Sequence, residues 1–228
     1  MKLYCVGTGS KGNCYLLESD GQVLLLDAGV PIKDIKKALN FDISRVVGCV
    51  VTHNHTDHSK SIKDLRLMGI PVFAPYIGEQ KKHSVQYIGF RITSFEVPHD
   101  GEPCVGFYIT VGDRRFLYAT DFEYIPVHFK TQKLTDLIIE CNHCDDLLSS
   151  DEKKYSHSVL GHASLEVTKG IVEANKTDSL TNVILCHLSE DWSDEKRMVE
   201  EVQGVAGNNV LVCAASQNTN YILNTPHI

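Results

Sequence analysis

The stretch VTHNHTDHSK, residues 51–60, places three histidines and an aspartate within six positions: His53, His55, Asp57 and His58. It continues the β-branched run Val46–Val51, which predicts a buried strand. Imidazole is the commonest side-chain ligand for borderline metals, and His53 and His55 are spaced to reach one ion from a tight turn. Asp57 and His58 can reach a second ion beside it. Such a cluster at a strand end indicates a metal site rather than a solvated polar loop.

Further candidate ligands stand singly at later strand ends. His99 follows the predicted strand RITSFEVP, Asp121 follows RRFLYAT, and His187 follows NVILC. Each alone is typical of a capping or turn residue. Because a sheet presents its strand ends along one edge, the three together predict a site shared with the residues of the 51–60 stretch.

Length and composition place this site on a folded scaffold. The 228 residues, 43% apolar and 22% charged, predict one domain over residues 1–228. The first residues, MKLYCVGTGSKGN, contain an apolar run that is too short for a signal peptide or a membrane span, so we expect a cytoplasmic protein without membrane contact. The eight cysteines are then reduced core residues. The net charge of −7 argues against a broadly basic nucleic-acid surface but leaves room for a local cationic groove.

Short strands and helices alternate along the chain without a linker or a repeat of constant period. Antiparallel strands come early in each half and helices come later, which favours two mixed sheets between helical layers over a doubly wound parallel sheet. Strands are expected at residues 2–6, 14–18, 22–26, 46–51, 71–74, 91–97, 105–111, 115–119, 136–140 and 182–186. Helices are expected at residues 31–39, 59–68, 164–174 and 193–205. The polar stretch 142–161 is predicted to be a loop near the site or a mobile lid.

The motif HNHTDH resembles the H-x-H-x-D-H signature of the metallo-β-lactamase fold superfamily, and His99, Asp121 and His187 follow in the order that this superfamily uses. Within it, the chain is most similar to the RNase Z-like phosphodiesterase and nuclease branch, and particularly to the WalJ/YycJ type of DNA exonuclease. The phrases GTGSKGNCYLLES, LLLDAG, YATD, LIIECNH, GHASLE and LCHLS carry the narrower resemblance. It implies an α+β fold, a four-layer αββα sandwich.

The resemblance also implies a ligand set for two divalent metal ions, zinc or manganese. His53, His55 and His99 would hold one ion, Asp57, His58 and His187 the other, and Asp121 would bridge them. Such a pair of ions hydrolyses nucleotide phosphodiester bonds through a metal-bridging hydroxide. Glu140 in LIIE and His162 in GHAS match the pair that helps the leaving oxygen depart, so the expected catalytic residues are Asp57, Glu140 and His162.

Several substrates stay open at this stage. A WalJ-like DNA exonuclease predicts a cationic groove, with Lys11, Lys60, Lys63 and Arg66 as candidates. A phosphodiesterase of small cyclic nucleotides needs only a compact pocket and tolerates the acidic charge. A thioester or lactone hydrolase on the same metal core, and a binding module without activity, are further alternatives. The resemblance also allows for a homodimer.

Two other motifs are set aside. Gly7, Gly9 and Gly12 spell the dinucleotide-binding pattern, but a strand-like segment follows where that fold needs a helix. Cys141 and Cys144 form a lone C-x-x-C without the second pair that a structural zinc needs. His143 between them is interpreted either as a substrate contact or as an exposed loop residue.

Overall fold

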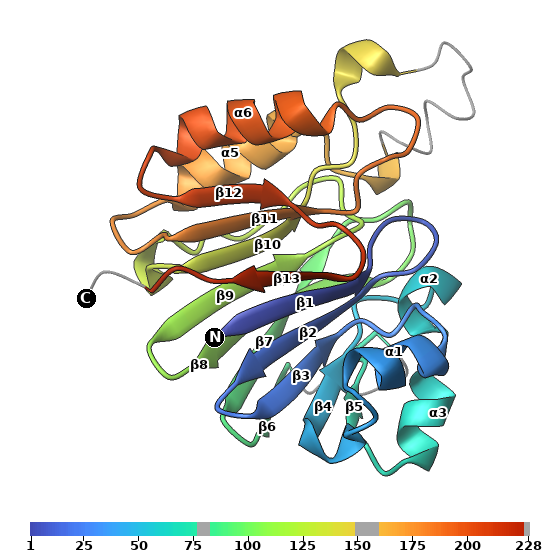
Figure 1. Cartoon of the computed structure of the whole chain (residues 1–228). Coiled ribbons are helices and arrows are strands. Elements are labelled where there is room, and N and C mark those ends of the chain that lie inside the picture. Colours follow the sequence, from blue (N-terminus) through green and yellow to red (C-terminus); the bar gives the residue numbers. More distant parts are fainter. Residues whose placement is uncertain (77–82, 149–159, 226–228) are drawn as a thin grey trace.

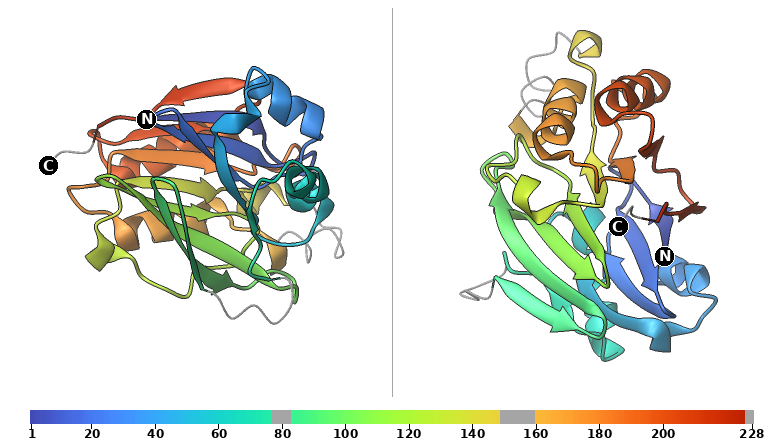
Figure 2. Two further views of the ribbon diagram at one scale, coloured as in Figure 1. Left: turned by 90° about the horizontal axis from the view of Figure 1, so that it is seen from below. Right: turned by 90° about the vertical axis from the view of Figure 1, so that its left-hand side faces the viewer.

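A computed structural model describes residues 1–76, 83–148 and 160–225. Its strands form two mixed sheets that lie face to face between layers of helices (Figure 1, Figure 2). The first sheet has the order β13-β1-β2-β3-β4-β5, with β1 Lys2–Gly7, β2 Cys14–Ser19, β3 Gln22–Leu26, β4 Val46–Val50, β5 Val72–Phe73 and β13 Thr219–Ile222. The second has the order β12-β11-β10-β9-β8-β7-β6, with β6 Ser84–Tyr87, β7 Phe90–Val97, β8 Cys104–Val111, β9 Arg114–Ala119, β10 Asp136–Glu140, β11 Asn182–Cys186 and β12 Leu211–Ala214.

The helices divide between the two outer faces. Those beside the first sheet are α1 Ile32–Ala38, α2 Thr56–Ser59 and α3 Ile62–Leu67, and those beside the second are α5 Leu165–Asn175 and α6 Glu195–Ala206. Short 3-10 turns lie at η1 Ile43–Arg45, η2 Lys130–Gln132 and η3 Asp145–Leu147. The side chains of Ser164 and Asp194 accept hydrogen bonds from the backbone amides of Val167 and Arg197 and so cap α5 and α6. No described helix is long and apolar enough to cross a lipid bilayer.

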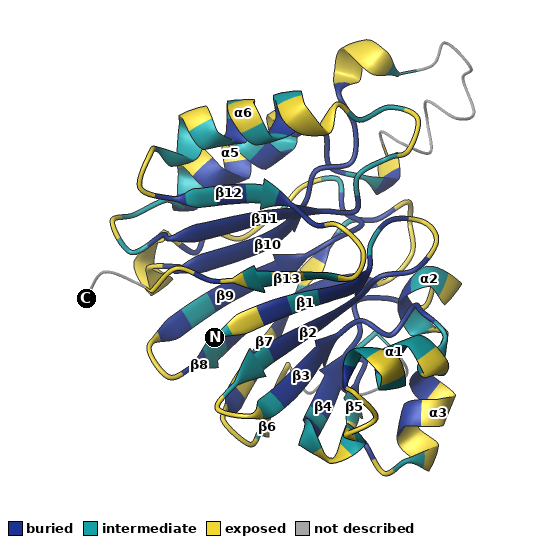
Figure 3. Cartoon of the chain, in the orientation of Figure 1, coloured by how far each residue is buried: buried dark blue, intermediate teal, exposed yellow. Residues whose placement is uncertain are grey.

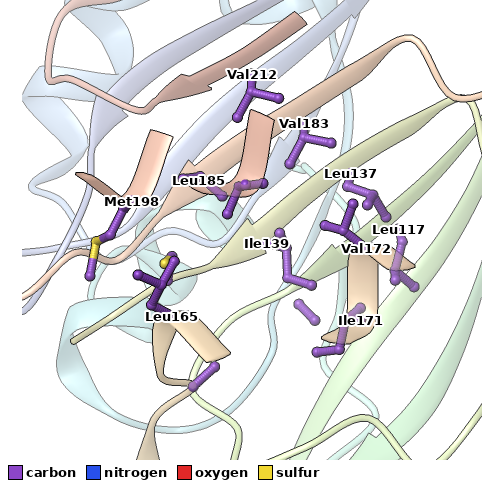
Figure 4. Packing of buried hydrophobic residues seen from close by; sticks show 14 of the residues in the cluster. Leu117, Leu137, Ile139, Leu165, Ile171, Val172, Val183, Leu185, Met198 and Val212 are labelled. Carbon is purple, nitrogen blue, oxygen red and sulfur yellow. The ribbon is translucent and has the colours of Figure 1, made fainter. Parts of the chain in front are cut away.

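Strand alternation explains the four layers. Successive side chains of a strand point to opposite faces, so a strand buried on both sides is apolar throughout. In β10, Ile138 packs between the sheets, whereas Leu137 and Ile139 pack under α5 and α6. In β3, Leu24 faces the second sheet and Leu25 faces α1 and α3. Figure 4 shows the layer under α5 and α6, and Figure 3 shows the buried central strands.

The predicted α+β class and αββα sandwich are confirmed, and the central strands lie within one or two residues of their predicted bounds. The prediction of a single domain stays a prediction. Three strands, β6, β12 and β13, were not predicted from the sequence. All three are short edge strands. β6 and β13 are partly exposed and carry no strong apolar pattern, whereas β12 is the apolar run LVCA and was overlooked.

The predicted helix at 59–68 is present as the shorter α3, and the short helix α2 that precedes it was not predicted. Ser61 lies between them. Its backbone amide donates to the carbonyl of Ala28, and its hydroxyl donates to the carbonyl of Val30 at 2.6 Å. These bonds fix the second helix to the loop after β3 and end the first, which carries the candidate ligands Asp57 and His58. Residues 149–159 of the predicted loop 142–161 lie outside the described residues.

Candidate metal centre

The candidate ligands lie on α2 and on loops after strands, at the end of the sandwich where α2 lies (Figure 1). Residues 51–55 connect β4 to α2, which carries Asp57 and His58, and His99, Asp121 and His187 follow β7, β9 and β11. Asp121 and His187 have left-handed backbone conformations, with φ of 55° and 53°. Such conformations are uncommon for residues other than glycine and concentrate at functional sites. The two strands therefore end in sharp turns that each present one polar side chain.

His53, His55 and His99 form the first group, with one nitrogen of each within 4.8 Å of the others. His53 Nδ1 lies 3.1 Å from Thr52 Oγ1, and the buried Nε2 of His53 has no hydrogen-bond partner in the described chain. His99 Nδ1 lies 2.8 Å from the carbonyl oxygen of Gly161, and its Nε2 lies 3.4 Å from His55 Nδ1. Three ring nitrogens thus face one position, which is the arrangement a divalent ion requires.

Asp57, His58 and His187 form the second group. Asp57 Oδ2 lies 3.4 Å from His58 Nε2 and 3.8 Å from His187 Nε2. The other ring nitrogen of each histidine is held from behind by a buried carboxylate. His58 Nδ1 lies 2.8 Å from Asp27 Oδ2, and His187 Nδ1 lies 3.1 Å from Glu140 Oε1. Carboxylates in this place fix the ring orientation and strengthen the facing nitrogen as a metal ligand.

Asp121 lies between the two groups. Its Oδ2 is 2.9 Å from His58 Nε2, and its Oδ1 is 3.5 Å from His187 Nε2. It also forms a potential ligand set with His53 and His58. A buried carboxylate in this place can give one oxygen to each of two neighbouring ions.

The electrostatics of the cluster follow from this packing. Burial lowers the pKa of His53 to about 2, so this imidazole is neutral. Burial also disfavours the charged form of His187, but Asp121, Asp57 and Glu140 outweigh it and raise its pKa to about 10. Burial disfavours ionised Asp121, yet His187 and His58 hold its pKa well below the usual range. In the metal-free protein, protonated His187 therefore supplies positive charge next to the carboxylates of Asp57, Asp121 and Glu140.

The residues fit divalent ions. The buried Nε2 atoms of His53 and His187 have no hydrogen-bond partner among the described residues, and each faces other candidate ligands. An uncompensated buried polar atom is costly, and a metal ion is the partner that neutral imidazoles and carboxylates bind together. This donor set suits a divalent ion that accepts both imidazole and carboxylate ligands.

Metal binding should depend on pH in a way that differs between the two groups. A metal ion needs neutral imidazole, so below pH 10 it must displace the proton of His187, and its affinity falls as pH falls. The fall is about tenfold per pH unit for each displaced proton. His53 carries no proton to displace above about pH 2. Zinc titration calorimetry in two buffers of different ionisation enthalpy should show proton release, and heats that do not depend on the buffer would contradict this expectation.

Asp27 supports the second group from behind. It is fully buried directly after β3, and its carboxylate accepts hydrogen bonds from the backbone amide of Thr52 at 2.8 Å and from the hydroxyl of Tyr118 at 2.5 Å. Together with His58 Nδ1, these groups surround the carboxylate with donors. Asp27 therefore fixes the ring of His58 and joins the two sheets beneath the site.

Asp27→Asn is expected to weaken metal binding by about 10- to 100-fold, the usual cost of losing such a support. The amide nitrogen of asparagine must face either Thr52 or the pair His58 and Tyr118, and all of these are donors. Asparagine tolerates the φ of 58° at this position, so the backbone is not the cause. Zinc affinity measured by chelator competition gives the result. Tyr118→Phe is the control, because it removes one donor and leaves His58 held, and a loss as large as that of Asp27→Asn would contradict the account.

Glu140 and His162 lie against the second group. Glu140 Oε1 is 2.8 Å from His162 Nδ1, and its Oε2 accepts from the backbone amide of Ala163 at 3.0 Å. His162 Nδ1 is also 3.2 Å from Asp121 Oδ1. Burial disfavours a charged His162, but Glu140 and Asp121 outweigh it and raise its pKa. The structure adds a contact that the sequence did not indicate, since Glu140 holds His187 as well as His162.

Sequence reasoning missed several residues that position the site. Asn13 donates from its backbone amide to the carbonyl of Asp57 at 2.7 Å, and its side-chain amide lies 3.0 Å from His58 Nε2. Gly29 donates to the carbonyl of Asn13, which joins the loops after β1, β3 and β4. The side-chain amide of Asn142 donates to the carbonyl of His187 at 2.9 Å. Asn13 and Asn142 lie in two of the sequence segments that carry the resemblance, GTGSKGNCYLLES and LIIECNH. Nothing in their spacing indicates these contacts.

The interpretation of His143 as an exposed loop residue is wrong. Its side chain is buried, and its backbone pairs with Ser164 in an isolated β-bridge. Cys141 and Cys144 are buried free thiols beside it. The four candidate groove residues, Lys11, Lys60, Lys63 and Arg66, are exposed, and Lys11 pairs with Glu190 at 2.5 Å. Whether they form a groove for nucleic acid stays a prediction.

Comparison with known proteins agrees with this geometry. The family model for the metallo-beta-lactamase superfamily matches residues 7–69, the segment from the glycine loop after β1 through α3. Over this segment the chain is similar to the metallo-β-lactamase superfamily. This match, the relatives described below and the cluster of candidate ligands together support a metal-dependent hydrolase.

Relatives within the superfamily cover most of the chain. The chain is 25% identical to the exodeoxyribonuclease YycJ of Bacillus anthracis over 218 residues, which covers 82% of this chain and 81% of that protein. It is 26% identical to the exodeoxyribonuclease WalJ of Streptococcus pneumoniae serotype 2 over 222 residues, or 83% of this chain and 82% of that protein. The metallo-β-lactamase fold protein YhfI of Bacillus subtilis superposes with a TM-score of 0.74 at 19% identity and covers 96% of this chain and 98% of its own.

Proposed function

We propose that the protein is a phosphodiesterase that uses two divalent ions, zinc or manganese, and removes nucleotides from the ends of DNA. His53, His55 and His99 would hold one ion, Asp57, His58 and His187 the other, and Asp121 both. The two relatives named exodeoxyribonucleases support DNA as the substrate.

The observation that carries the proposal is the placement of His162, held by Glu140 at 2.8 Å and lying against Asp121. When bound, the two ions would supply an ionised water and would offset the negative charge of the phosphoryl oxygens. The leaving sugar oxygen must also gain a proton, because an alkoxide is a poor leaving group. Glu140 accepts from Nδ1 and, with Asp121, raises the pKa of His162, which favours the protonated imidazole, so Nε2 would be the atom that gives up the proton.

The need of the leaving group for a proton also helps to rank the alternative hydrolase activities. A thiolate leaves without protonation, so a thioester hydrolase has less use for the pair of Glu140 and His162. A lactone hydrolase, whose leaving group is an alkoxide, is not disfavoured by this argument. A phosphodiesterase of cyclic nucleotides remains the second candidate. Its support is the size of the two cavities beside His53 and His99, about 540 Å³ each, which suits a small ligand. A homodimer stays a prediction.

His162→Ala is expected to lower the rate of DNA hydrolysis by about 10²- to 10⁴-fold, the usual contribution of a general acid. Hydrolysis of bis(p-nitrophenyl) phosphate should fall by less than about tenfold, because p-nitrophenolate needs no proton to leave. Metal content, measured by atomic emission, should not change. Glu140→Gln should show the same difference between the two substrates in weaker form, with some loss of metal because Glu140 also holds His187. Equal losses on both substrates would contradict the acid role.

A further inference from the structure

Two neighbouring cavities open beside the first group of histidines. One is lined by His53, His55 and Asn54, the other contains His99, and Tyr76, Glu102 and Pro103 line both. A substrate whose phosphoryl group lies on the metal cluster can therefore place the part next to this group in these cavities.

The lining is acidic and has an aromatic wall. Glu96, Glu102 and Glu123 line the cavity that contains His99, and no lysine or arginine lines either cavity within residues 1–76, 83–148 and 160–225. Arg66 lies close enough to affect the pKa of Tyr76 but lines neither. Carboxylates repel phosphate groups and accept hydrogen bonds from base amines and sugar hydroxyls.

Tyr76 and Pro103 supply the flat apolar surfaces of this wall. Tyr76 follows β5 and is partly exposed, and Pro103 is exposed on the facing loop before β8. A base can stack on an aromatic side chain whatever its identity, so such a wall suits a nucleoside without selecting its sequence.

We propose that these cavities form a subsite for the terminal nucleoside of the substrate, and that Glu102 excludes any further phosphate on that side. The inference rests on the proposed function and deepens it. A chain end that carries an uncharged nucleoside fits, whereas an internal position, or an end with an added phosphate, meets carboxylates. The site would then select chain ends through charge, with Tyr76 as a positioning residue for the base.

Binding of products tests this without relying on turnover. Calorimetry with the zinc- or manganese-loaded protein compares inorganic phosphate, thymidine 3′- and 5′-monophosphate, and thymidine 3′,5′-bisphosphate. One phosphate of the bisphosphate lies on the metal cluster and the other is then forced toward the cavity. We expect the bisphosphate to bind about threefold or more weakly than the tighter monophosphate, because its second phosphate would lie close to the carboxylates of the cavity. Glu102→Gln should reduce this difference, and the exposed Glu200→Gln on α6 should not.

Binding measurements on variants of Tyr76 test the role of the aromatic wall separately. Tyr76→Leu should weaken binding of the tighter monophosphate by about fivefold or more and leave inorganic phosphate unchanged, because only the base loses its stacking partner. Tyr76→Phe should restore binding. The proposal is overturned if the bisphosphate binds as tightly as the monophosphate, or if neither Glu102→Gln nor Tyr76→Leu changes the pattern. Failure to hydrolyse bis(p-nitrophenyl) phosphate would instead contradict the proposed function, since the binding measurements stand without catalysis.

Discussion

Asp121→Asn is expected to lower phosphodiester hydrolysis by about 10³-fold or more and to reduce the metal content from two ions to one or fewer. A bound ion contributes several kcal/mol of transition-state stabilisation, and each 1.36 kcal/mol corresponds to a factor of ten in rate. Asp121 is the buried carboxylate that lies within reach of both candidate groups. Without its charge, a second cation beside the first is no longer compensated.

Asparagine is the informative substitution at this position. Asp121 has a φ of 55°, and asparagine adopts left-handed conformations more readily than alanine does. A loss of activity then reports on the charge rather than on the backbone. Asp113→Asn is the matched control, because Asp113 is exposed in the turn at the opposite end of β9. Metal content by atomic emission and hydrolysis of bis(p-nitrophenyl) phosphate give the two readouts. Full metal content with full activity in Asp121→Asn would contradict the bridging role.

Gly29→Ala is expected to destabilise the protein by about 3 kcal/mol and to abolish binding of the second ion. Gly29 packs directly against the backbone of residues 51–58, which carry four candidate ligands and are called the ligand loop here. A Cβ at this position would overlap the carbonyl of Asp57 and would lie 2.7 Å from the amide nitrogen of His58. These are backbone atoms that cannot rotate away, so the loop itself must move, and overpacking of this kind costs about 1–3 kcal/mol or more.

Gly170→Ala is the matched control for this prediction. Gly170 is exposed within α5, and a Cβ there meets no atom within 4 Å. The same substitution should therefore stabilise the protein, by about 0.5–1 kcal/mol, because alanine favours the helix. Urea unfolding of both variants, with and without zinc, measures the difference. If Gly29→Ala has wild-type stability and binds two ions, the close contact between the loops after β3 and β4 is not needed for the site.

The sequence predicts those parts of the fold and site that local patterns determine. The central strands, such as β3, β10 and β11, are continuous apolar runs because they are buried on both faces, and such runs are recognisable without a structure. The ligand loop is recognisable because its four polar residues stand together. His99, Asp121 and His187 are recognisable because each ends a strand.

The remaining features depend on contacts between distant segments. Gly29 matters because the carbonyl of Asp57 packs against it, and Asn13 matters because its backbone amide reaches the same carbonyl. The second contact of Glu140, to His187, joins strand ends 47 positions apart, from residue 140 to residue 187. Edge strands such as β6 and β13 carry weak patterns because half of each is exposed. No periodicity in the chain encodes these contacts.

The most direct test of the proposed function uses linear DNA labelled at either the 5′ or the 3′ end, with covalently closed circular DNA of the same sequence beside it. The manganese- or zinc-loaded protein is incubated with each, and products are resolved by length over time, with Asp121→Asn and chelated protein as controls. We predict stepwise shortening of the linear DNA from one end, an intact closed circle, and no products in either control. Nicking of the circle at the same rate as cleavage of linear DNA, or no cleavage of DNA by fully metal-loaded protein, would contradict the account.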